Sequence, residues 1–277
     1  MNKKHYLLKT ITYIALLVMI LLAVFPAVWM LSTSVKRTTE LYDMPPEIIP
    51  DEPTFSNYIN VLQTSKMYTA FLNSVIVTAF VVVLTLMISV LAGYGLSRYR
   101  FRGHGLIKLM LLFGQMVPGV VLVIPLFFML SSVKLTDTLR ALIIADMALT
   151  IPMGVVMLSA FFESVPKELE EAARIDGTSQ VGALYRVILP IAKPGMISVA
   201  IYTFIHTWEE FLFALNLTVS GSKRTLPIAI STFAGEFSVD WGATMAASTI
   251  VALPVLLIFL LANRYFVQGL ADGAVKG

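Results

Sequence analysis

Long stretches without a charged residue constrain this chain more than any other feature. Residues 10–35 and 67–97 contain no Asp, Glu, Lys, Arg or His. A helix needs about 20 apolar residues to cross the hydrocarbon core of a bilayer. Over the whole chain 57% of the residues are hydrophobic and 13% are charged. Soluble domains carry about twice that share of charge, so lipid must be the solvent for much of the surface.

Six segments are long and apolar enough to cross a membrane. Their runs are continuously apolar and do not alternate, which favours helices over a barrel. The first run is too long for the apolar part of a cleaved signal peptide, so we expect it to be retained. We predict an all-α polytopic membrane protein with one domain over residues 1–277 and spans at about 11–31, 70–96, 109–131, 141–162, 194–217 and 243–266.

The distribution of Lys and Arg predicts the orientation of these spans. An even number of spans places both termini on one side, and that side carries 13 of the 20 basic residues. Because cytoplasmic loops are enriched in Lys and Arg, we expect both termini and segment 163–193 to be cytoplasmic. A net charge of +3 spread over such loops does not indicate nucleic-acid binding. The chain has no Cys, which excludes disulfides, thiol catalysis and Cys-ligated metals.

Segment 163–193 is much longer than a connector between two spans needs to be. Pro166 suits the first turn of a helix, and acids at 168, 170 and 171 follow near the positive end of the helix dipole. Asp176 and Gly177 suit the end of that helix, because Gly adopts the left-handed conformation. Its small apolar stripe consists of Leu169, Ala172 and Ala173.

A second helical stretch follows and extends to Leu189 and Pro190. We expect one apolar side on it, formed by Val181, Leu184, Val187 and Ile188. Two interpretations of the whole segment remain open. It is either a docking element for another protein, or a surface segment that lies on the membrane or on its own protein.

Ionisable residues at membrane depth are the second set of candidates. A lone charge in hydrocarbon costs at least about 2.5 kcal/mol on insertion scales, so such residues should face a bundle interior or an aqueous path. His206 lies one helical turn before both Glu209 and Glu210, so it can share a face with either. The candidates for a substrate pathway are Gln115, Asp146, His206, Trp208, Glu209 and Glu210. Structural pairing between helices, or for Trp208 a place at the membrane interface, is the alternative.

Several motifs in the chain resemble one known family. Glu171-Ala172-Ala173, followed by Gly177 and then Val187-Ile188-Leu189-Pro190, is similar to the EAA loop of permease subunits of binding-protein-dependent ABC importers. In that family the position of Val187 is usually Ile. Trp208-Glu209-Glu210-Phe211 resembles a Trp-Asn-Glu-Phe motif of sugar permeases, and the tail 266–277 is similar to that of maltose-type subunits.

The resemblance implies a type I ABC importer permease fold and a carbohydrate, oligosaccharide-transporting branch. It implies that the EAA loop holds a coupling helix for cytoplasmic ATPase subunits, with Glu171, Ala172, Ala173, Asp176, Gly177, Leu189 and Pro190 as coupling residues. The implied partners are a second homologous permease, two ATPase subunits that use ATP and Mg²⁺, and an extracytoplasmic sugar-binding protein. The tail from Gln268 to Lys276 would approach the ATPase interface.

Two other classes compete with this interpretation. The chain has no Gly-x-x-x-x-Gly-Lys-Ser/Thr phosphate loop, so a partner must hydrolyse any ATP. An ion-coupled secondary transporter could instead use Asp146 with Glu209 or Glu210 as a relay, although the two repeated halves typical of that class are not apparent. A membrane-embedded enzyme would need a catalytic or metal-ligand constellation, and the spacing of the His, Asp and Glu residues provides none. We therefore predict a transport subunit, not an enzyme, with no catalytic and no metal site.

Overall fold

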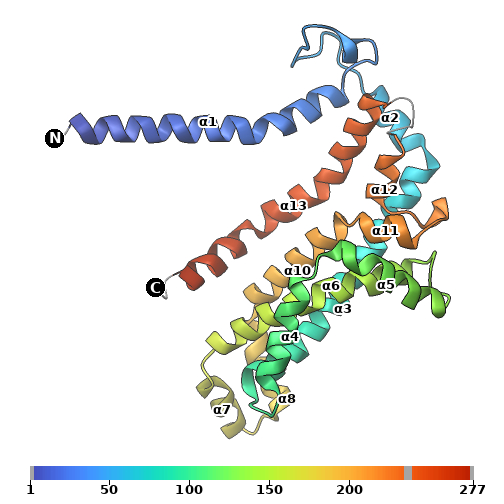
Figure 1. Cartoon of the computed structure of the whole chain (residues 1–277). Coiled ribbons are helices and arrows are strands. Elements are labelled where there is room, and N and C mark those ends of the chain that lie inside the picture. Colours follow the sequence, from blue (N-terminus) through green and yellow to red (C-terminus); the bar gives the residue numbers. More distant parts are fainter. Residues whose placement is uncertain (1–2, 234–238, 275–277) are drawn as a thin grey trace. The chain divides into compact units, whose positions relative to one another are not determined.

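The computed structural model describes residues 3–233 and 239–274 (Figure 1). The side chains after Leu261, and those of residues 3–5, 7 and 65, lie outside that description. Helices make up nearly all of the regular structure of the described residues. The chain divides into two units, Met1–Met67 with Ile230–Pro254 and Tyr68–Ala229 with Val255–Gly277, and each is described by itself.

The first unit contains α1 (Lys3–Ser34), η1 (Glu40–Tyr42), α2 (Ser56–Gln63) and the beginning of α13 (Trp241–Ala274). The buried Asn57 of α2 fastens the end of α1, since its Nδ2 donates to the carbonyls of Ser34 at 3.0 Å and Lys36 at 2.9 Å. A helix leaves such terminal carbonyls unpaired. The apolar side chains of α1 are exposed along most of its length, as expected of a helix whose surroundings are lipid or another subunit.

The second unit is built on three long helices: α3 (Ser65–Arg98), α6 (Leu139–Ser164) and α10 (Lys193–Trp208). Figure 1 shows these helices side by side, with α7 (Glu168–Ile175) and α8 (Gln180–Ala183) at one end. Halfway along, the hydroxyls of Thr85 and Thr150 form a buried hydrogen bond of 2.9 Å between α3 and α6. The remaining elements of this unit are α4 (His104–Met116), α5 (Gly119–Ser132), η2 (Leu184–Ile188), α9 (Leu189–Ile191), α11 (Leu212–Leu217), η3 (Gly221–Lys223) and α12 (Leu226–Ser231).

Two apolar clusters hold the second unit together, one toward each end of the long helices. The first joins α3, α5, α6, α11 and α12, and it includes the fully buried Leu142 and Phe213. The second joins α3, α6, η2 and α10, and its members are Val90, Tyr94, Leu158, Phe162, Val165, Leu184, Ile188, Ala192 and Val199. The second cluster therefore anchors the segment that follows α7 to the long helices.

Two of the predicted spans are not continuous helices. We predicted one span over 109–131, but within it α4 and α5 meet at 103°, with Pro118 between them. Pro118 has no N–H to donate, and the residue before it is extended, with ψ 119° at Val117. In the predicted span 194–217, α10 ends at Trp208 and a separate helix begins at Leu212. The segment before α10 is also bent, by 75° relative to α10.

Within the described residues, four helices are long and apolar enough to cross a membrane as they stand. They are Leu8–Ser34, Lys66–Arg98, Leu139–Ser164 and Trp241–Leu261. The number rises to as many as six if each strongly bent pair is counted as one span. The assignment of six spans with the stated limits stays a prediction.

Candidate functional site

The predicted helix after Pro166 is present as α7, which covers Glu168–Ile175. Its end has the expected conformation, because Gly177 has a φ of +84°. The N–H of Gly177 donates to the carbonyl of Arg174 at 3.1 Å, and that of Thr178 donates to the carbonyl of Ala173 at 3.0 Å. This pair of hydrogen bonds is a Schellman motif, which satisfies the last carbonyls of a short helix.

One side of α7 faces its own protein and the other is open. Ala173 is buried and the carboxylate of Glu170 is nearly so, whereas Glu171, Ala172 and Asp176 are exposed. Ile175 is 87% exposed, which is unusual for an isoleucine outside lipid. The small apolar stripe that we predicted is therefore divided, since Ala173 packs inward while Leu169 and Ala172 stay exposed.

The second helical stretch begins with a side-chain cap, because Ser179 Oγ accepts a hydrogen bond of 3.1 Å from the N–H of Gly182. Leu184 and Ile188 are buried as expected, but Val181 is 66% exposed. Our prediction of one continuous apolar side was wrong at Val181. The α-helical spacing that we assumed does not persist, because the chain forms a wider π-turn over η2. Leu189 is half-buried and Pro190 is exposed.

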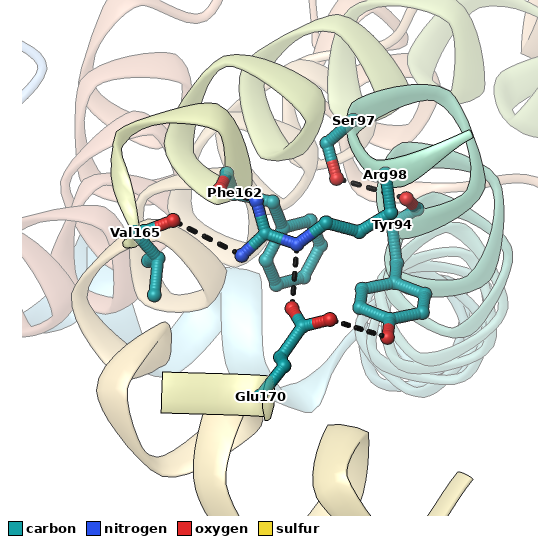
Figure 2. Close-up of polar contacts among 6 residues, drawn as sticks. All are labelled: Tyr94, Ser97, Arg98, Phe162, Val165 and Glu170. Atoms are coloured by element: carbon teal, nitrogen blue, oxygen red, sulfur yellow. Dashed lines mark hydrogen bonds and ion pairs between the residues drawn. The ribbon is translucent and has the colours of Figure 1, made fainter. Parts of the chain in front are cut away.

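Arg98, in the last turn of α3, connects α7 to the ends of two long helices (Figure 2). Its Nε donates to Glu170 Oε1 at 2.5 Å, and its terminal nitrogens donate to the carbonyls of Phe162 at 2.8 Å and Val165 at 3.1 Å. Tyr94, one turn earlier, donates its hydroxyl to Glu170 Oε2 at 3.1 Å. We refer to Tyr94, Arg98 and Glu170, with the carbonyls of Phe162 and Val165, as the clamp.

Sequence reasoning missed the clamp, because Arg98 was counted only as a basic residue of a loop. The ion pair is almost enclosed, with 5% of the Arg98 side chain and 12% of the Glu170 side chain exposed. A signal was present in the sequence. Tyr94 and Arg98 are four residues apart at the end of an apolar run, so they lie on one helix face.

Asp146 lies inside the second unit, as the cost of a membrane-depth charge predicts. Only 2% of its surface is exposed, and in the described part of the chain its Oδ1 has no hydrogen-bond partner. Its backbone carbonyl accepts a hydrogen bond of 2.9 Å from the Thr150 hydroxyl, which itself faces Thr85.

Gln115 is exposed on α4 and donates its side-chain amide to the carbonyl of Leu149 at 3.1 Å.

The predicted pathway residues around Trp208 lie in different surroundings. Trp208 is 2% exposed, with Phe204 stacked on it at 5.4 Å and Phe71 edge-on at 6.2 Å, so it is not at a lipid interface. His206 contacts the ring of Tyr202 on α10, and Glu209 is exposed beyond the end of that helix. The helix α10 ends at Trp208, just before the two acids, and the predicted sharing of one helix face by His206 with Glu209 or Glu210 stays a prediction.

Glu210 has a local structural role that sequence reasoning did not identify. Its carboxylate accepts hydrogen bonds from the N–H groups of Phe213 at 2.6 Å and Ala214 at 2.9 Å. These are the first-turn N–H groups of α11, which that helix cannot satisfy by itself. The signal was an acid just before an apolar run, at a position from which its side chain can reach forward to the free N–H groups of the helix that follows.

The His, Asp and Glu side chains of the described residues come from all along the chain. Among them, no group of three or more His, Asp or Glu residues is placed to hold a metal ion. The tail residues from Gln268 to Lys276, which the resemblance placed near an ATPase, lie outside the described side chains. The described residues thus form a helical protein with membrane-spanning candidates and a short, exposed helix at one end.

Comparison with known proteins supports this class and gives the family. Residues 85–272 match the family described as binding-protein-dependent transport system inner membrane component. The chain is 35% identical to the sulfoquinovosyl glycerol transport system permease protein SmoH of Agrobacterium fabrum, over 97% of this chain and 94% of SmoH. It is 34% identical to the trehalose/maltose transport system permease protein MalG of Thermococcus litoralis, over 99% of both chains.

A solved structure shows the same fold at lower identity. A chain of a bacterial ABC transporter involved in the import of the acidic polysaccharide alginate superposes with a TM-score of 0.85 at 22% identity, covering 96% of this chain and 99% of that one. The protein therefore belongs to the family of binding-protein-dependent transport system inner membrane components. The predicted family, the ABC importer permease fold and the assignment as a transport subunit rather than an enzyme are confirmed. The ion-coupled carrier and the membrane enzyme are not supported.

Proposed function

We propose that this chain forms one half of the membrane pathway of an ATP-driven sugar importer and that α7 is the helix on which an ATPase subunit docks. The family works with binding proteins, as its description states. The relatives SmoH and MalG are permease proteins of transport systems for sulfoquinovosyl glycerol and for trehalose/maltose. A glycoside or short oligosaccharide is therefore the substrate class that we assign to this chain.

The observation that carries the docking proposal is the contrast between the two sides of α7. Its inner side is held by the clamp, and its outer side presents Glu171, Ala172 and Ile175 to solvent. Small side chains allow close approach, and an exposed isoleucine favours burial against a partner. Apolar surface continues beyond the helix, because Val181 and Tyr185 are also exposed.

Each partner in this proposal lies in the membrane or on a particular side of it. Both termini and α7 are cytoplasmic, following the excess of Lys and Arg in those segments. We assign the binding of ATP and Mg²⁺ to two ATPase subunits, since this chain has no phosphate-binding loop of its own. A second, homologous permease completes the pathway in the lipid bilayer, and an extracytoplasmic sugar-binding protein delivers the substrate from the opposite side.

The candidate pathway residues differ in how well their surroundings suit contact with substrate. Asp146 and His206 keep a side-chain atom without a partner among the described residues, and Gln115 is exposed. These three remain candidates for the pathway. The contacts of Trp208 and Glu210 favour roles within the fold, and Glu209 is exposed.

Charge reversal on the outer side of α7 tests the docking proposal. We expect Glu171→Lys to leave membrane insertion intact and to reduce ATP-dependent uptake at least tenfold. Gly177→Pro should act in the same direction, because proline cannot adopt a φ of +84°. The matched control is Glu163→Lys, which reverses an exposed charge outside α7 and breaks only an exposed pair with Lys108. Normal uptake with both α7 variants would show that this helix is not the docking element.

A further inference from the structure

The short helix α7 needs contacts that keep its orientation fixed when a partner binds to it. A short helix with one buried alanine gains little from apolar packing, and helices of this length are marginal in water. If a partner pushes on the exposed side of α7, something must prevent the helix from tilting on its own. The clamp joins α7 directly to α3 through Glu170, and the same Arg98 of α3 holds the end of α6.

The guanidinium of Arg98 is well suited to this task. Its donors lie in a rigid planar fork, so a single side chain can hold several acceptors in fixed directions. Two of these acceptors are the carbonyls of Phe162 and Val165, at the C-terminal end of α6, where a helix carries unpaired carbonyls and a partial negative charge. The third is the carboxylate of Glu170, in the first turn of α7.

Tyr94 adds a second connection between α3 and α7. Its hydroxyl holds the other oxygen of Glu170, so both carboxylate oxygens are bound by residues of α3. Its ring packs edge-on against Phe162 of α6, with ring centroids 5.9 Å apart (Figure 2). Each of the three helices is therefore joined to the other two through Arg98, Tyr94 and Glu170.

We infer that Arg98 and Glu170 are positioning residues that make α7 move as one rigid body with the adjoining ends of α3 and α6. This inference rests on the proposed function, since it concerns how displacement of α7 by an ATPase reaches the membrane helices. The Arg98–Glu170 ion pair can resist displacement of α7 because it is buried, so that little water can screen its charges or replace its hydrogen bonds. A tilt of α7 alone would leave buried charges unpaired, and the structure resists that change.

The chain provides its own control for this inference. Lys108 of α4 and Glu163 of α6 also form an ion pair, but 32% and 41% of their side chains are exposed. Exposed pairs contribute little, since water and salt replace them. Lys108→Gln therefore removes an ion pair at the same end of the molecule without touching the clamp.

Distance measurements between two spin labels test the inference directly. The chain has no Cys, so Arg174→Cys on α7 and Met87→Cys on α3 introduce the only labels of this chain, both at exposed positions and neither among the docking residues. The complex is purified with its ATPase subunits and measured without nucleotide and with ATP plus vanadate. With the clamp intact, we expect one narrow distance distribution that is the same in both states. With Arg98→Gln, we expect the distribution to broaden or shift when ATP and vanadate are added, whereas Lys108→Gln should behave like the intact protein.

Two outcomes would overturn the inference. One is a nucleotide-dependent shift between these labels in the protein that retains Arg98, which would show that α7 moves independently of α3. The other is an Arg98→Gln protein that keeps the narrow, unchanged distribution. If Arg98→Gln does not fold, Glu170→Gln is used instead, because it removes the charge and keeps the shape. Failure of any ATPase subunit to co-purify with the intact protein would contradict the proposed function itself, which is a separate result.

Discussion

At the scale of single residues, two neighbouring glutamates show how position decides the role of a charge near the membrane. Glu209 is exposed just beyond α10, whereas Glu210 is half-buried and caps α11. Hydrogen bonds to a charged group are stronger than neutral ones, at about 1.5–3 kcal/mol each. Helix caps contribute about 0.5–2 kcal/mol. Glu210 is therefore expected to stabilise the fold, and Glu209 is not.

Alanine substitution separates these two glutamates. We expect Glu210→Ala to lower the free energy of unfolding by about 1–2 kcal/mol, because two N–H groups of α11 lose their acceptor. Glu209→Ala should change it by less than about 0.5 kcal/mol, as is usual for exposed positions. Thermal unfolding of the purified protein in detergent provides the measurement. Equal stability losses in both variants would show that the contacts of Glu210 do not stabilise α11.

Asp137 connects two loops of the second unit through its carboxylate. It accepts hydrogen bonds from the hydroxyl of Ser220 and from the N–H groups of Ser220 at 2.8 Å and Val219 at 2.9 Å. These bonds, with a smaller contribution from Lys223, lower the pKa of Asp137 below its ordinary value. A lowered pKa in the folded state means that the carboxylate stabilises the fold fully above the ordinary aspartate pKa. This contribution is lost as the pH falls through the lowered pKa.

The Asp137 connection should therefore weaken in acid. We expect the stability difference between the native protein and Asp137→Ala to be largest at neutral pH and to shrink below the ordinary aspartate pKa. Asp137→Asn is the control, since asparagine also tolerates the φ of +59° at this position but does not titrate. Thermal unfolding of the three proteins as a function of pH is the measurement. A difference that stays constant down to strongly acidic pH would rule out this role of the carboxylate.

At the scale of elements, glycine allows the long helices of the second unit to approach closely. A Cβ atom on Gly154 of α6 would lie 2.4 Å from Ser89 Oγ of α3 and 3.2 Å from Val199 of α10. Small residues at such crossings permit close helix packing in membranes. The hydroxyl of Ser89 is buried, and within the described residues it has no hydrogen-bond partner, so its removal leaves no group unsatisfied.

A double-mutant cycle tests this crossing. We expect Gly154→Ala to destabilise the protein by about 1–3 kcal/mol, because the new methyl group overpacks the contact with Ser89. Ser89→Ala should be close to neutral alone, and in the double variant it should restore part of the loss, since the closest clashing atom is gone. The free energy of unfolding is measured for all four proteins. Strict additivity of the two changes would contradict the geometry of this crossing.

The elements also show which parts of the structure can be predicted from sequence. The helix α7 and its end at Gly177 depend on residues close together in the chain, so capping and dipole rules located them. The 103° turn between α4 and α5 was not predicted, because hydropathy marks an apolar run but does not show where a helix within it breaks. Arg98 and Glu170 are 72 residues apart, and local patterns carry no information on their pairing.

At the level of the whole molecule, the family and the arrangement of α7 both agree with a transport subunit that works with other proteins. The family matches residues 85–272, which include the clamp and α7. The proposed function assigns ATP hydrolysis to a partner, and α7 presents an open side next to a buried attachment. We therefore expect an ATP-hydrolysing partner to sit on that open side.

Site-specific photocrosslinking tests this claim most directly. A photoreactive amino acid replaces Ile175, the most exposed apolar residue of α7, and the protein is illuminated in its native membrane. Val219, 79% exposed in the loop after α11, is the comparison position. If an ATPase docks on α7, position 175 forms a covalent adduct with an ATP-binding subunit, and position 219 forms none with that subunit. Adducts of position 175 with lipid alone, or with a protein that binds no ATP, would contradict it.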